Sequence, residues 1–321
     1  MVPEAGATTL TAPPMRALIV TNMYPTAARP ALGSFVRDQV EALRRIEGID
    51  LEVFAFAPGG GSTYARAAAD LIRRHRHDRF DVVHAHFGLT AWPAFGARAK
   101  VRAVTLHGTD LAHPRSRKIT LAALPLLDLV AAVSEPLSSQ IPRWAVRSRR
   151  AVLPIGVDVG RFRPIPRAEA RAALGLEPDG PYLLFPSDPR RLEKRYDRAQ
   201  ALASTIPLLT LGQVEPAQVP LYVNAANAVL VPSAREGFGL AVLEALACDV
   251  PVLATPVGIH PAALTGIAGA YCAPFDEPAW RAALAPHLAA TDPRIHGRAR
   301  AEQFSTDRMA AAVVAAWRSL L

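Results

Sequence analysis

Short runs of apolar residues alternate with longer segments of helical periodicity along most of this chain. Between the first two runs, for example, residues 34–46 place Val36, Val40 and Leu43 on one face of a helix. The apolar runs of the first half lie at 16–22, 51–57, 80–86, 101–107, 129–134 and 150–155. Strands that are apolar throughout and separated by helices are typical of a parallel sheet covered on both faces. The alternation therefore predicts an α/β fold.

The segment 156–180 interrupts this alternation with several prolines, and we interpret it as a crossing between two domains. The apolar runs then resume at 182–187, 207–212, 227–233, 251–256 and 267–272. We expect two doubly wound, Rossmann-like domains, over residues 15–155 and 156–305, with a cleft between them. Residues 1–14 are expected to form a disordered tail, and 306–321 a helix that packs back toward the first domain. Ligands bind such sheets at the carboxyl ends of the strands, so functional residues are expected in the loops that follow the strands.

The composition narrows the class of protein. Of the 321 residues, 50% are hydrophobic and 20% are charged, which is ample for sizeable cores. Only Cys248 and Cys272 occur, which excludes a disulfide scaffold and favours a reducing compartment. The longest apolar stretch, 119–133, contains Pro125 and Asp128 and is too short to span a bilayer. The N-terminus does not resemble a signal peptide, so the expected location is the cytoplasm.

The net charge of +8 is concentrated in the first half of the chain. Residues 1–160 carry 20 Lys and Arg against 13 Asp and Glu, a net charge of +7, whereas residues 161–321 carry a net charge of +1. Such a domain suits nucleic acid, an anionic membrane surface or an anionic substrate; the alternative is a solvated, Arg-rich surface. The basic runs lack interleaved aromatic residues and any recognisable nucleic-acid module, so we expect no nucleic-acid partner.

The segment 231–258 carries the most chemical information. A predicted strand ends at Ser233, Glu236 follows in a short loop, and Gly237-Phe238-Gly239 opens a predicted helix that contains Glu244. Free backbone N–H groups at a helix start bind anions, and glycines allow a phosphate to approach the backbone closely. The alternative is that both glutamates simply favour the positive end of a helix, and Glu169 and Glu177 show the same interval without such a context.

Seven motifs, in order along the chain, resemble those of the retaining GT-B glycosyltransferases of family 4. They are YPTAARPALGSFVRDQVEAL, DVVHAHFG, TLHGTD, LVAAVSEPL, VLPIGVDVGRFRP, FPSDPRRLEKRYDRA and EGFGLAVLE. The resemblance covers most of the chain. It implies an acceptor-binding first domain, a second domain that binds a nucleotide-sugar donor, and retention at the anomeric carbon.

The resemblance assigns roles to the second domain position by position. Glu236 is expected to contact hydroxyls of the transferred sugar, and Glu244 to hold the ribose of the nucleotide. Lys194, with Arg190, is expected to neutralise the diphosphate as it leaves. The donor is also expected to meet the backbone at the helix start, formed by Gly237, Phe238, Gly239 and Leu240.

In the first domain the resemblance places Asp110 on the donor side of the cleft, and Gly33 in a loop that approaches the donor phosphate or the acceptor. The alternative for Gly33 is a loop glycine that supplies a positive φ. The resemblance also places the imidazole of His107 beside the reacting sugar, and we expect His86 to line the acceptor side. His84 and His86 lie two residues apart on one predicted strand, but no third metal ligand is evident. No Asp-x-Asp pair occurs in the chain, so we expect transfer without a metal ion or other cofactor.

The chain departs from the family pattern in three places. Ile155 stands where the family usually has Asn, and Arg190 precedes Lys194 by four residues instead of the commoner five. The region 195–228 is shorter than in many members, so residues 213–218 must help to clasp the base. The identity of the base, UDP or GDP or another, therefore stays open.

The predicted function is the transfer of a sugar from a nucleotide diphosphate sugar to an acceptor hydroxyl. The acceptor is expected to be a cell-envelope glycan or a lipid-linked molecule, with peripheral association at an anionic membrane. The alternatives are a sugar-nucleotide epimerase on the same fold and a non-catalytic partner protein with a degenerate donor site. A dehydrogenase is disfavoured because no G-x-G-x-x-G follows the first strand.

Overall fold

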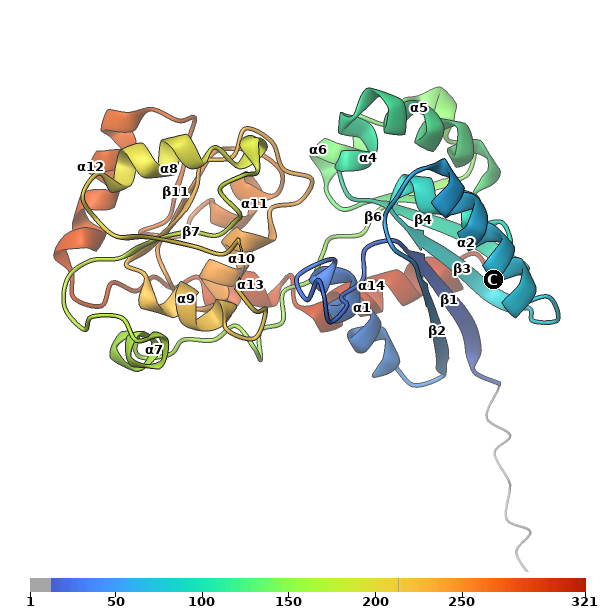
Figure 1. The fold of residues 1–321 in the computed structure, drawn as a ribbon, viewed down its shortest axis with the longest axis horizontal. Helices are drawn as coiled ribbons and strands as arrows, with labels where there is room; N and C mark the ends of the chain where they lie inside the picture. Colours follow the sequence, from blue (N-terminus) through green and yellow to red (C-terminus); the bar gives the residue numbers. More distant parts are fainter. Residues whose placement is uncertain (1–12, 213) are drawn as a thin grey trace, which may run out of the picture.

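The computed structural model describes residues 13–212 and 214–321, so the predicted tail 1–14 lies almost wholly outside the described residues. Within these ranges the chain forms two α/β lobes side by side (Figure 1). Each lobe is built on one parallel sheet with helices packed around it, which confirms the predicted fold class.

The sheet of the first lobe has six parallel strands in the order β2-β1-β3-β4-β5-β6. They are β1 (Met15–Thr21), β2 (Ile49–Ala55), β3 (Phe80–His86), β4 (Ala99–Leu106), β5 (Leu129–Ala132) and β6 (Arg149–Val152). The order reverses between β1, which pairs with β2 on one side, and β3 on its other side. Loops that follow neighbouring strands diverge at such a reversal and leave a crevice at the carboxyl ends.

Short helices connect these strands. They are α1 (Ser34–Arg44), α2 (Gly61–Arg74), α3 (Ala91–Ala94), α4 (Thr109–Ala112), α5 (Pro114–Ala123) and α6 (Glu135–Ser138). Helix α1 buries Val36, Val40 and Leu43 against the sheet, as its periodicity predicts.

The sheet of the second lobe has five parallel strands in the order β11-β10-β9-β7-β8. They are β7 (Leu183–Phe185), β8 (Leu208–Thr210), β9 (Ala228–Val231), β10 (Val252–Ala254) and β11 (Tyr271–Cys272). This order reverses between β7 and β9. Strand β11 is shorter than the apolar run 267–272, because Gly266 and Gly269 adopt φ values of 78° and 81°, which no strand accommodates.

The helices of the second half are α7 (Arg167–Leu174), α8 (Tyr196–Ala203), α9 (Val219–Ala225), α10 (Leu240–Ala247), α11 (His260–Leu264), α12 (Glu277–Ala289), α13 (Arg298–Glu302) and α14 (Thr306–Arg318). The chain crosses between the lobes twice, and the two crossings lie side by side. The N–H of Val157 donates to the carbonyl of Phe304, and the N–H of Thr306 donates to the carbonyl of Val157.

Helix α14 lies against the first lobe, next to α1 (Figure 1). Ala310, Val313 and Trp317 are buried there in one cluster with Ile19 and Val40. The last helix of the chain therefore completes the core of the first lobe.

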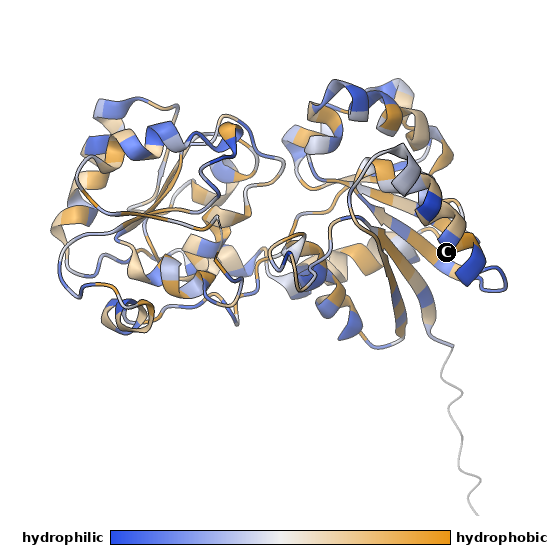
Figure 2. Cartoon of the chain, viewed as in Figure 1, coloured by the Kyte–Doolittle hydropathy of each residue, from blue (hydrophilic) through white to orange (hydrophobic). Residues whose placement is uncertain are grey.

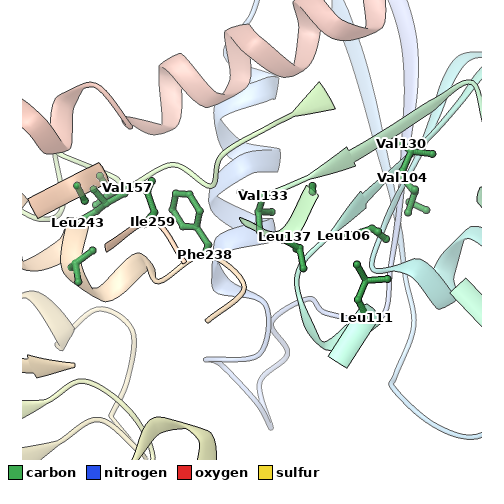
Figure 3. Packing of buried hydrophobic residues seen from close by; sticks show 14 of the residues in the cluster. Val104, Leu106, Leu111, Val130, Val133, Leu137, Val157, Phe238, Leu243 and Ile259 are labelled. Atoms are coloured by element: carbon green, nitrogen blue, oxygen red, sulfur yellow. The ribbon is translucent and has the colours of Figure 1, made fainter. Parts of the chain in front are cut away.

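A second cluster of buried side chains joins the two lobes (Figure 3). Phe238 packs with Leu243 and Ile259 of the second lobe, and the same cluster includes Val133 and Leu137 of the first. Apolar residues follow the strands, whereas hydrophilic residues gather on the outer helices (Figure 2). Across the described residues, every helix is too short or too polar to cross a bilayer.

Candidate active site

A cleft of about 530 Å³ lies between the lobes, within the range of about 300–1,000 Å³ that small-molecule sites occupy. It is lined by loops at the carboxyl ends of strands from both sheets. From the first lobe come Gly33 after β1 and His107 after β4, and from the second come Lys194 after β7 and Glu236 after β9. The topology of the two sheets thus brings together residues as far apart in the sequence as Gly33 and Glu236.

The turn at Gly237–Leu240 forms one wall of the cleft and opens helix α10. Its glycines are required by the backbone: Gly239 has a φ of 101°, and its Cβ, if present, would lie 2.3 Å from Nε2 of His260. None of the described residues accepts a hydrogen bond from the N–H groups of this turn. The N-terminus of α10 is therefore free to bind an anion.

Lys194 and Glu236 form an ion pair in the lining of the cleft, on the same side as the turn at Gly237–Leu240. Nζ of Lys194 lies 2.7 Å from both carboxylate oxygens of Glu236, and the two side chains are only 16% and 8% exposed. Oε1 of Glu236 also accepts a hydrogen bond of 2.7 Å from the hydroxyl of Ser233. Lys194 is thereby held as a fixed cation beside the free N–H groups.

The structure does not bring Arg190 into this cleft. Its guanidinium forms hydrogen bonds to both carboxylate oxygens of Asp188 and lines a separate cavity beside Thr210 and Gly212. The neighbouring residue, Arg191, lines the cleft instead, where it pairs with Glu193 at 2.7 Å.

Arg235 is a further cation on the wall of the cleft. Its side chain is exposed and has no hydrogen-bond or ion-pair partner among the described residues. The positive groups that face the cleft are thus Lys194, Arg191 and Arg235.

Glu244 lies one turn into α10 and is not part of the cleft lining. Burial raises its pKa to about 7; the charges of Arg161 and Lys194 act in the opposite direction, and Asp38 adds to the increase. Arg161 itself is held by Asp38 of α1 at 2.5 Å, an ion pair between the crossing segment and the first lobe. The carboxyl of Glu244 therefore changes its charge near neutral pH.

On the opposite wall, Gly33 and His107 line the cleft. Gly33 has a φ of 65°, and a Cβ there would lie 2.1 Å from the carbonyl oxygen of Met23, so only glycine fits. The two walls touch where a Cβ on Gly237 would lie 1.8 Å from the carbonyl oxygen of His107. Ser134 joins them further, because its hydroxyl donates to the carbonyl of Gly237 at 2.7 Å.

Asp110 and His86 lie behind this wall rather than on it. The carboxylate of Asp110 is fully buried and accepts hydrogen bonds from the backbone N–H groups of Gly88, His107 and Gly108. Burial raises the pKa of Asp110, and these backbone hydrogen bonds limit the increase. Asp110 therefore shapes the loop that presents His107, and the fully buried His86 stands behind the ring of His107, with its Nδ1 3.1 Å from Nε2 of His107.

Several cleft residues carry no signal in the sequence. Phe35, Gln140, Arg191 and Arg235 line the cleft, and Ser134 connects its walls, but none stands out in a motif by its residue type. Arg191 alone has an indication in the sequence, because it adjoins the predicted Arg190 and either arginine of this pair could face the cleft. Among the described residues, no group of three or more His, Cys, Asp or Glu has an arrangement that could hold a metal ion.

Comparisons with known proteins match both lobes. A family model described as Glycosyltransferase Family 4 matches residues 32–161, and one described as Glycosyl transferases group 1 matches residues 185–289. A D-inositol 3-phosphate glycosyltransferase of Actinosynnema mirum is 30% identical to this chain, over 81% of this chain and 77% of the relative.

Solved structures share the fold. A sucrose-phosphate synthase from Thermosynechococcus elongatus has a TM-score of 0.75 at 20% identity, over 96% of this chain and 99% of that one. Anabaena HepE, solved in complex with UDP and glucose, has a TM-score of 0.68 at 16% identity, over 95% of this chain and 100% of that one. The predicted fold and family are both confirmed. The chain belongs to the group 1, family 4 glycosyltransferases and is an enzyme of that class with a GT-B fold.

Proposed function

We propose that this enzyme transfers a sugar from a UDP- or GDP-sugar to an acceptor hydroxyl, with retention at the anomeric carbon and without a metal ion. One observation carries the proposal: Lys194, the free N–H groups of residues 237–240 and His107 meet in a single cleft. The first two suit a diphosphate, and His107 faces them from the other lobe. The relatives named as glycosyltransferases support the same reaction class.

Lys194 and the N–H groups of α10 neutralise the diphosphate. Negative charge develops on this leaving group, so fixed donors stabilise the transition state more than the ground state. Arg191 and Arg235 add positive charge on the same wall. Arg190, predicted from the family motif, contributes only if it leaves Asp188. These cations supply the charge stabilisation that a divalent metal would otherwise provide.

Glu236 and His107 hold the transferred sugar between the two lobes. Both oxygens of Glu236 already accept hydrogen bonds from Lys194, so its carboxylate is fixed in place for sugar hydroxyls. Glu244 lies one turn into α10, behind the cleft lining, and its carboxylate accepts a hydrogen bond from a ribose hydroxyl. The base lies toward β8 and the loop 211–218, of which residue 213 lies outside the described residues.

In a mechanism without a covalent glycosyl-enzyme intermediate, retention requires that the acceptor attack from the face that the diphosphate leaves. In that geometry the acceptor oxygen forms the new bond to the anomeric carbon as the diphosphate oxygen departs. The departing oxygen then takes the proton of the acceptor hydroxyl. This assignment rests on the family resemblance, and nuclear magnetic resonance of the anomeric proton in the product tests it directly.

The acceptor is an anionic molecule, either a glycan or lipid-linked, of the kind found in cell envelopes. Support comes from the net charge of +7 on residues 1–160 and from the relative named as acting on D-inositol 3-phosphate. With a lipid-linked acceptor, the enzyme works at the inner face of the membrane from the cytoplasm. Binding to acidic phospholipid vesicles that weakens with added salt is then expected, and salt-independent binding contradicts it.

Calorimetry with UDP, GDP and ADP tests the donor site. Selective micromolar binding that Glu244→Ala removes is the expected result, since Glu244 is assigned to the ribose. Glu169→Ala is the matched control, because Glu169 is an exposed glutamate in the first turn of α7. Failure of all three nucleotides to bind refutes the proposal and favours a non-catalytic partner protein.

A further inference from the structure

Five aromatic rings form a column that runs from the last helix of the chain to the cleft. Trp317 of α14 meets His84 edge-on, with ring centroids 5.6 Å apart. His84 stacks on His86 at 5.0 Å, and His86 stacks on His107 at 5.3 Å. Phe35 of α1 closes the column at the cleft, 5.0 Å from His107. Trp317, His84 and His86 are fully buried.

At the inner end of the column, hydrogen bonds fix the tautomer of His84. The indole N–H of Trp317 can only donate, and it lies 3.0 Å from Nδ1 of His84. Nδ1 must therefore be an acceptor, which leaves the proton of the neutral ring on Nε2. That proton is donated to the hydroxyl of Thr105, 2.8 Å away.

At the cleft end, His86 and His107 share a single hydrogen bond. Nδ1 of His86 lies 3.1 Å from Nε2 of His107, so only one of these two nitrogens carries a proton. The outer nitrogens, Nε2 of His86 and Nδ1 of His107, are buried and have no partner among the described residues. The tautomer and the ring orientation of His107 therefore depend on His86.

The surroundings keep the column uncharged. Burial lowers the pKa of all three histidines, that of His86 to about 4, and the neighbouring imidazoles lower the values of His84 and His107 further. Asp110 borders the column, and at the cleft end His107 shares the cavity lining with the charged side chains of Arg191, Glu193, Lys194, Arg235 and Glu236. The carboxylate of Asp110 is occupied by backbone N–H groups and does not bind a ring.

We propose that His86, His84 and Trp317 are positioning residues for sugar transfer, which hold His107 in one tautomer and one orientation beside the reacting sugar. Trp317 fixes His84, the stacked ring of His84 supports His86, and His86 fixes His107 by a hydrogen bond. The C-terminal helix, from the far end of the sequence, is thereby a structural part of the active site. This inference rests on the proposed role of His107.

Long-range proton–nitrogen spectra of the imidazole rings test the column without any substrate. In the full chain, all three histidines are expected to stay neutral from pH 8 to pH 5, with His84 protonated on Nε2. Trp317→Phe keeps a ring but removes the N–H donor, so the tautomer of His84 should become mixed. Trp280→Phe is the matched control, since Trp280 is equally buried in the second lobe and donates to the carbonyl of Pro274 at 3.1 Å. An unchanged His84 spectrum in Trp317→Phe overturns the proposal.

Kinetics with UDP-glucose then separate positioning from general stability. His86→Phe keeps the stack but loses the hydrogen bond, and should lower kcat by about 10- to 100-fold with KM for the donor unchanged. His86→Asn retains a hydrogen-bonding group near the former Nδ1 and should restore kcat to within about fivefold of the parent. Equal losses in His86→Asn and His86→Phe, or equal losses in Trp317→Phe and Trp280→Phe, contradict the inference. If the parent turns over no nucleotide sugar, the proposed function fails while the spectra still decide on the column.

Discussion

Gly237→Ala is the sharpest test of the way in which the two lobes meet. The added Cβ would lie 1.8 Å from the carbonyl oxygen of His107, 2.8 Å from its carbonyl carbon and 3.3 Å from Cα of Gly108. All three neighbours are backbone atoms on strand-end loops, so no side chain can rotate away. We expect the variant to relieve the overlap by a separation of the lobes at this point.

The size of the separation follows from the geometry. Real Cβ atoms essentially never approach other heavy atoms closer than 3.0 Å, so the contact at 1.8 Å must open by about 1.2 Å. A displacement of about 1 Å between reacting groups reduces the rate of an enzyme by about 100-fold, or about 2.7 kcal/mol in the activation free energy. The displaced groups are His107 on one wall and the N–H groups of α10 on the other. The Ser134 hydrogen bond to the carbonyl of Gly237 is lost as well.

Steady-state kinetics with a sugar derivative of the nucleotide that calorimetry selects measure this effect. We expect kcat to fall by about 100-fold while the affinity for the free nucleotide changes less than about threefold, because the nucleotide contacts lie on the second lobe. Gly61→Ala is the control: a Cβ there meets nothing within 4 Å, and the backbone is not left-handed. A kcat for Gly237→Ala within threefold of the parent would show that catalysis does not depend on this contact.

Three further predictions concern charge. Arg191→Gln should lower kcat by about tenfold because Arg191 lines the cleft, whereas Arg190→Gln, paired with Asp188 outside it, should change kcat less than twofold; the reverse order refutes the placement. The pKa of Glu244 is raised to about 7, so its carboxyl gains a proton below pH 7. The affinity for UDP, measured by calorimetry, should therefore weaken by up to about tenfold from pH 8 to pH 6. In Glu244→Gln the affinity should not change with pH over this range. Burial lowers the pKa of His86 to about 4 from the unfolded value near 6.5, so the unfolded state binds the proton first as pH falls. His86 alone should therefore lower the free energy of unfolding in urea by about 2 kcal/mol between pH 7 and pH 5, and the buried His84 and His107 should add to this loss. His86→Asn should reduce that loss, and an equal loss in the variant contradicts the argument.

The sheets could be predicted because their strands are buried on both faces. Strands β1 and β9 are apolar almost throughout, and a run of that kind between helices has few alternatives to a parallel sheet. Strand β11 was harder, because its length depends on two glycines with left-handed backbones, which composition alone does not reveal. The βαβ connections require parallel strands but do not fix their order, so the place where the loops converge is seen only in the structure.

Residues of the site could be predicted only where an unusual residue type stands at an expected position in a motif. Gly33 is forced by its conformation, and Lys194 is one of three lysines in a chain rich in arginine. Which of Arg190 and Arg191 lines the cleft depends on how the loop after β7 turns. In the structure Arg190 pairs with Asp188, and Arg191 lines the cleft. The motif around Asp110 is compatible with a side chain that points into the cleft or away from it. Only the structure shows that its carboxylate is turned inward, toward backbone N–H groups. Local sequence does not encode such orientations.

The ion pair of Lys194 and Glu236 is better explained by function than by stability. Both side chains are nearly buried, and taking two charges out of water costs about as much as their attraction returns, so an apolar pair of similar size would fold at least as well. The pair instead holds a cation in place beside the free N–H groups of α10, where no described residue satisfies them. Lys194 and those N–H groups favour an anion between the lobes. The close approach of Gly108 to Gly237 places His107 in the same cleft, so that the carboxyl ends of two separate sheets face each other there.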